Sequence, residues 1–70
     1  MSVHFTIETE LEDDGRWIAE VLEMPGVLAY GQTQTEAKAK VQALAFRVLA
    51  EQLENGETTS DLMSVQFEAA

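Results

Sequence analysis

The sequence predicts a small α+β domain in which three strands, one long helix and a fourth strand follow one another (β-β-β-α-β). Two features carry this prediction: apolar and polar residues alternate early and late in the chain, and a helix-forming segment with clear end signals lies between. We expect an antiparallel three-stranded meander, a fourth strand beside the first (spatial order 3-2-1-4), and the helix packed on one face. At 70 residues the chain has room for a single domain, residues 1–70.

The first strand is expected over residues 3–11, where apolar and polar side chains alternate. The face expected to be buried carries Val3, Phe5, Ile7, Thr9 and Leu11, and the opposite face carries His4, Thr6, Glu8 and Glu10. The Asp14-Gly15 step that follows is typical of a hairpin turn. The next strand should therefore pair with the first in antiparallel fashion.

The second strand is expected over residues 16–23, and its apolar residues fall on both faces, which favours a central position in the sheet. Pro25 and Gly26 should end it, because proline has no N–H for the ladder and glycine relieves the bend. A short third strand is expected over residues 27–30, and Gly31 should let the chain leave it.

The helix is expected from about Gln34 to about Asn55, over a segment rich in strong helix formers. Thr33 and Glu36 have the spacing of a capping box, in which each side chain bonds a free backbone N–H at the helix start. Asn55-Gly56 is a typical helix stop.

The helix carries more apolar surface than one sheet needs. One stripe, expected to cover the sheet, consists of Ala37, Val41, Leu44, Ala45 and Val48. A second stripe, about 140° further around the helix, consists of Phe46, Leu49 and Leu53. This stripe needs cover from the last strand, expected over residues 62–68, or from another subunit, so it is the candidate oligomer interface. Because so small a domain is marginally stable alone, we expect a homo-oligomer, either a dimer or a tetramer.

The composition excludes several classes of function. The sequence has thirteen acidic and four basic residues, giving a net charge of −9, whereas direct nucleic-acid binding needs a basic surface. The same acidity permits a basic protein partner, or it serves solubility alone. No cysteine is present, so disulfides are excluded, and a single histidine makes a metal site an unfavoured expectation. With no signal-like or membrane-spanning segment, we expect a soluble cytoplasmic protein without a membrane partner.

No arrangement typical of catalysis is visible, so we expect no enzyme activity, no catalytic residue, no cofactor and no metal. His4 is the only imidazole, and no serine has a nucleophile-elbow context. The least favoured alternative is a divalent-metal nuclease, whose acids would be Glu8 or Glu10 together with Glu36 and Glu68.

The segment from Asp14 to Glu57 resembles the HicB-like antitoxin family. In order, it contains Asp14-Gly15, an aromatic-led strand from Trp17, the loop Met24-Pro25-Gly26, a small strand, the helix start GQTQTEA (residues 31–37), and a long helix ending in Asn55-Gly56-Glu57. The resemblance implies a truncated ribonuclease-H-like fold without its active site. It also implies an antitoxin that binds and neutralises a small basic messenger-RNA interferase of the HicA type. Family members often carry a C-terminal DNA-binding segment, which this sequence does not show, so we expect no direct nucleic-acid binding.

Acidic residues near the first hairpin are the candidate partner-binding residues, because seven of the 13 acids precede residue 24. They are Glu12, Asp13, Asp14, Glu20 and Glu23. The alternative is an orphan self-assembling HicB-like protein that has no toxin partner and no catalysis, held together by the second helix stripe.

Overall fold

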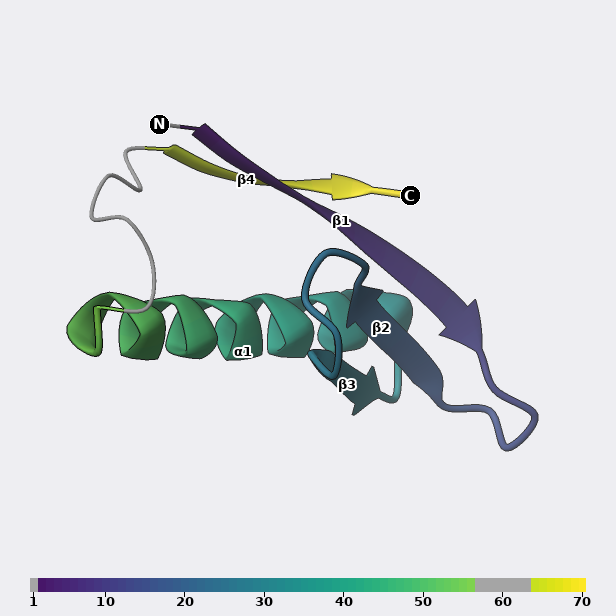
Figure 1. The fold of residues 1–70 in the computed structure, drawn as a ribbon. Coiled ribbons are helices and arrows are strands. Elements are labelled where there is room, and N and C mark those ends of the chain that lie inside the picture. Colours follow the sequence, from purple (N-terminus) through teal and green to yellow (C-terminus); the bar gives the residue numbers. More distant parts are fainter. Residues whose placement is uncertain (1, 57–63) are drawn as a thin grey trace.

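The computed structural model describes residues 2–56 and 64–70, and it has the predicted element order. The elements are β1 (Ser2–Leu11), β2 (Trp17–Val21), β3 (Leu28–Gly31), α1 (Gln34–Glu54) and β4 (Ser64–Ala69). The four strands form one sheet in the order β3-β2-β1-β4, with α1 on one face (Figure 1). The predicted fold class and strand order are confirmed.

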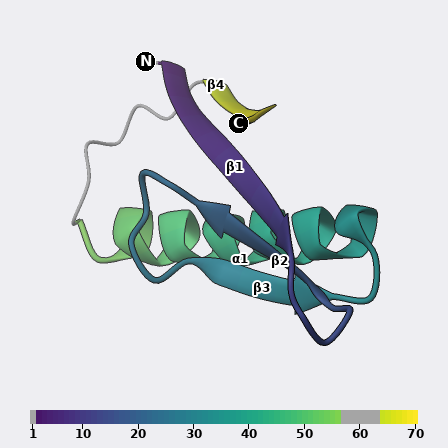
Figure 2. The same ribbon diagram turned by 90° about the vertical axis from the view of Figure 1, so that its right-hand side faces the viewer.

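The first strand, β1, is an inner strand of the sheet, and its two halves pair with different strands. Its C-terminal half, from Ile7 to Leu11, pairs with β2 in antiparallel fashion. Its N-terminal half, from Ser2 to Ile7, pairs with β4 in parallel. The helix packs mainly against β3 and β2, so β4 and the start of β1 extend away from it (Figure 2).

The core lies between α1 and one face of the sheet, the face to which Ile7, Ala19 and Val21 point. Its buried members are Phe5, Ile7, Ala19, Val21, Val27, Ala37, Val41, Ala45 and Leu49. Val21 and Val41 are the largest side chains that are fully buried. Small alanines on both α1 and β2 let the helix backbone approach the sheet closely.

The second strand is shorter than expected, since it ends at Val21 instead of residue 23. A tight turn follows at once: the N–H of Met24 donates to the carbonyl of Val21 at 3.1 Å, and the N–H of Val21 donates to the carbonyl of Val27 at 3.0 Å. Gly26 has a φ of +86° in this turn, which side chains other than glycine rarely adopt.

The helix begins and ends as predicted. The hydroxyl of Thr33 accepts from the N–H of Glu36 at 3.0 Å. The carboxylate of Glu36 accepts from the N–H of Gln32 at 3.3 Å, one residue earlier than in a standard capping box. At the other end, the N–H of Asn55 still bonds the carbonyl of Glu51, and Gly56 turns the chain with a φ of +67°.

The assignment of Leu49 to a separate helix stripe is wrong, because Leu49 is only 8% exposed and belongs to the core of its own chain. The buried arc of the helix is centred between Val41 and Ala45, and Leu49 lies on its border. Phe46 and Leu53, the other members of that stripe, are 51% and 40% exposed. Strand β4 supplies part of the expected cover, since the rings of Phe46 and Phe67 meet edge to face at 5.5 Å. Residues 62 and 63 of the expected last strand lie outside the described part of the chain.

Candidate functional site

The candidate partner-binding acids fall at two ends of one strand. Glu12, Asp13 and Asp14 form the turn between β1 and β2. Asp14 is already engaged: its carboxylate accepts from the backbone N–H of Arg16 at 3.0 Å and from the Arg16 guanidinium at 2.7 Å. These two bonds, the backbone one first, lower the pKa of Asp14 below its ordinary value of 3.8.

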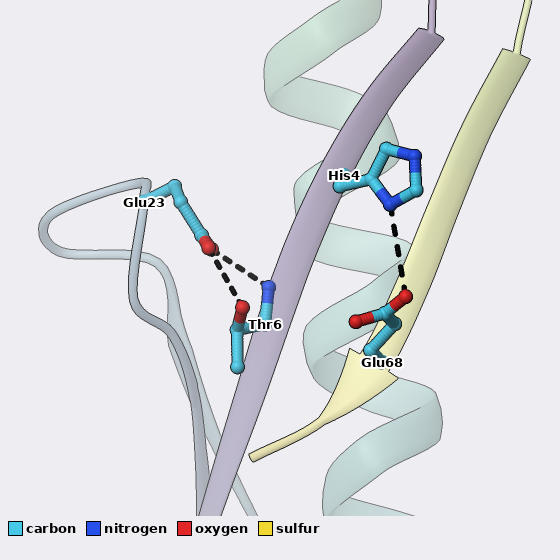
Figure 3. Close-up of polar contacts among 4 residues, drawn as sticks. All are labelled: His4, Thr6, Glu23 and Glu68. Carbon is cyan, nitrogen blue, oxygen red and sulfur yellow. Dashed lines mark hydrogen bonds and ion pairs between the residues drawn. The ribbon is translucent and has the colours of Figure 1, made fainter.

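Glu23 lies beyond the opposite end of β2 and is also engaged within the chain. Its carboxylate accepts from the N–H of Thr6 at 2.7 Å and from the hydroxyl of Thr6 at 2.8 Å (Figure 3). The backbone bond, and then the hydroxyl bond, lower the pKa of Glu23 below its ordinary value of 4.5. Because β2 ends at Val21, the Glu23 carboxylate takes the place of the β2 carbonyl that would otherwise accept from the N–H of Thr6.

The candidate acids therefore do not make one patch. The carboxylates of Asp14 and Glu23 each accept hydrogen bonds from one residue of the same chain, at opposite ends of β2. Asp13 is exposed at the hairpin turn. Glu20 lies between the two ends, on the face of the sheet turned away from α1.

On that face, here called the outer face, residues from three strands are neighbours, which the sequence alone did not predict. Strand register places Glu20 opposite Glu8 on β1 and opposite Leu28 on β3. The members of the outer face in the β1-β2-β3 part of the sheet are Glu8, Glu10, Ile18, Glu20, Leu28 and Tyr30. The alternation of polar and apolar residues gives the face of each strand, but only the register shows which carboxylates are neighbours.

The lysines and Arg47 lie away from the outer face, but Arg16 reaches it at Tyr30. Among the described residues, ion pairs join Arg16 to Asp14 at 2.7 Å and Lys40 to Glu36 at 3.1 Å, and Nδ1 of His4 lies 3.7 Å from the carboxylate of Glu68. The guanidinium of Arg16 also lies 4.4 Å from the ring centre of Tyr30. Lys38, Lys40 and Arg47 are on the helix, in the other layer. Within residues 2–56 and 64–70, no ion pair involves Glu8, Glu10 or Glu20.

The contact of His4 with Glu68 joins β1 to β4 (Figure 3). Both side chains are more than half exposed, so the contact lies open to water. Across the described residues, no group of three or more histidine, aspartate or glutamate side chains could hold a metal ion. In particular, Glu36 is bonded to Gln32 and Lys40 at the helix start, so the metal site considered from sequence is not assembled there.

Two open grooves flank the core. The larger, of about 300 Å³, is lined by Phe5, Glu23, Met24, Pro25, Val27, Val48, Leu49 and Gln52. The smaller, of about 190 Å³, is lined by Ile7, Lys38, Gln42, Phe67, Glu68 and Ala69. These volumes are at or below the lower end of the range for small-molecule sites.

A membrane-crossing helix, long and apolar enough to span a bilayer, is not found in the part of the chain that the structure describes. Comparisons of the chain with protein-family models, with curated proteins and with solved structures found no match.

Proposed function

We propose that this protein is an inhibitory binding protein that neutralises a small basic messenger-RNA interferase of the HicA type. The observation that carries the proposal is the set of outer-face carboxylates, Glu8, Glu10 and Glu20, which have no ion pair within the described residues. The strand order and the sequence resemblance to HicB-like antitoxins support it. The cytoplasm, where messenger RNA is translated, is the location that this role requires.

The physical basis of inhibition is competition for cations. A ribonuclease must hold the phosphates of its RNA with lysine and arginine side chains. An acidic protein with a net charge of −9 would be attracted to the same side chains and would exclude the RNA by occupying them. Attraction of this kind speeds association at low salt and weakens as salt screens the charges.

Affinity purification from the native host at low salt tests the proposal. A tagged copy of the chain should retain a small basic protein in a fixed molar ratio, identified by mass spectrometry. That protein, purified alone, should cut messenger RNA, and one equivalent of this chain should stop the cutting. Recovery of no basic ribonuclease, or cutting that continues in the presence of excess chain, would contradict the proposal.

A second candidate, an orphan protein that assembles with itself, is favoured by the exposure of Phe46 and Leu53 on α1, at 51% and 40%. Phe46→Glu tests it better than a change at Leu49, because Leu49 is part of the core and replacing it would destabilise the fold itself. Analytical ultracentrifugation should give a dimer or tetramer for the wild type and a folded monomer for Phe46→Glu. An unchanged assembly would remove this helix face as the interface.

A further inference from the structure

We infer that the outer face of the sheet is the docking surface for the basic partner, with Glu8 and Glu20 together receiving one arginine or lysine side chain. This inference rests on the proposed function for the basic character of the partner. It replaces the hairpin turn, which the sequence favoured, with a surface in the middle of the sheet.

The register makes Glu8 and Glu20 direct neighbours. They are opposite residues on antiparallel strands and point to the same side of the sheet. The N–H of Leu22 donates to the carbonyl of Thr6 at 3.0 Å, and the N–H of Glu12 donates to the carbonyl of Arg16 at 2.8 Å, so both Thr6–Leu22 and Glu12–Arg16 stand at hydrogen-bonded positions of the ladder. Because such pairs recur every second residue, Glu8 and Glu20 form the next one, and their Cβ atoms are about 5 Å apart. Two carboxylates at this spacing can both reach a single cation.

The free protein gains nothing from this arrangement. Like charges that stand directly opposite one another destabilise a sheet. No described cation contacts either side chain. A positive side chain from a partner would remove the repulsion and gain attraction from both carboxylates at once.

Apolar side chains beside the carboxylates give the surface the mixed character of a protein interface. Leu28 lies next to Glu20 across the β2–β3 pair, and Tyr30 lies next to Ile18. Leu28 and Tyr30 are 37% and 39% exposed. Aromatic and aliphatic side chains of this kind supply the anchoring contacts of interfaces, while charges set orientation and association rate.

The charge pattern selects a basic partner over a second copy of the chain. Two copies meeting through their outer faces would bring four carboxylates of Glu8 and Glu20 together, on molecules that each carry a net charge of −9. The hairpin is a weaker candidate, because Asp14 is already paired with Arg16 at 2.7 Å.

The test uses hexa-arginine as a defined basic probe. In low salt, NMR amide shifts of the folded chain should change most around Glu8, Glu10 and Glu20. Glu8→Gln and Glu20→Gln should each weaken hexa-arginine binding about threefold, the size expected for losing an exposed ion pair. Two matched variants lose the same charge elsewhere: Asp13→Asn at the hairpin and Glu51→Gln on the exposed side of α1. Both should weaken binding less than the outer-face variants.

A second readout separates binding from mere loss of charge. Glu20→Gln should raise the melting temperature of the free protein, because it removes the repulsion from Glu8, while Asp13→Asn should not. Shifts centred on the hairpin, or equal effects of Glu20→Gln and Asp13→Asn on both readouts, would overturn the inference. If the ribonuclease is neutralised equally well by the Glu8→Gln/Glu20→Gln double variant, the docking surface is wrong while the proposed function stands. If hexa-arginine maps to the outer face but no ribonuclease is neutralised, the proposed function fails instead.

Discussion

Replacing Gly31 with alanine should damage this fold more than any other glycine-to-alanine change at a described position. Gly31 ends β3 and is buried where the chain passes the first turn of α1. A Cβ atom there would lie 2.5 Å from the backbone nitrogen of Ala37 and 3.0 Å from its Cα. Both atoms belong to the helix backbone, so no side chain can rotate away to make room.

The expected cost follows from that rigidity. Inserting a methyl group into a packed region costs about 1–3 kcal/mol, and a clash with backbone favours the upper end, about 3 kcal/mol. A domain of 70 residues has a free energy of unfolding of about 4–10 kcal/mol. A loss of about 3 kcal/mol would lower the melting temperature by roughly 12–24 °C. The variant should therefore remain folded at low temperature but unfold far earlier on heating.

Gly26→Ala is the matched control. Nothing lies within 4 Å of the Cβ position at Gly26, but its φ of +86° is unfavourable for alanine. That conformational cost is about 1–2 kcal/mol. Urea unfolding of both variants can be followed by the fluorescence of Trp17, which pairs with Gly31 across the sheet. Equal losses of stability for the two variants, with unchanged dependence on urea, would refute the close-approach argument.

Two further predictions concern polar contacts. Thr33→Ala should lower the free energy of unfolding by about 1 kcal/mol, because the N–H of Glu36 loses its acceptor, and Thr33→Ser should restore most of it; equal stability of the alanine and serine variants in urea would contradict this. Glu23→Gln should destabilise the protein at pH 7, because the charged carboxylate is the better acceptor for Thr6. Since folding lowers the pKa of Glu23 from 4.5, its contribution is present above that value and is lost as pH falls through the folded pKa. The stability gap between wild type and Glu23→Gln should therefore narrow as pH falls below 4.5, and a gap that stays constant with pH would show that the carboxylate charge is not the cause.

The order of elements could be predicted from the sequence because each carries a strong local signal. Alternation over residues 3–11 marks a half-buried strand, and Thr33 with Glu36 marks the helix start. The strand order follows from the connections, since a helix between two strands of one sheet favours a parallel neighbour. These signals depend on nearby residues only.

The features that could not be predicted from the sequence depend instead on contacts between residues that are far apart in the chain. Leu49 lies at the border of the buried helix arc, where the shape of the sheet decides whether it is covered. Gly31 was expected to act through backbone freedom, yet its importance comes from the helix that crosses it. The pairing of Glu8 with Glu20 needs the register, which a shift of one residue would abolish.

The pairing of the first strand with the last sets the order of events as the chain is made. Ser2 pairs with Ser64, so this contact closes a far longer loop than the hairpins or the helix contacts do. The edge of β1 that pairs with β4 stays unpaired until β4 has been made. About 40 residues separate the end of β3 from the end of β4, and at a synthesis rate of roughly 5–20 residues per second they take about 2–8 s to appear. During those seconds the half of β1 that carries Phe5 lacks its β4 partner, and the growing chain is most exposed to association with other molecules.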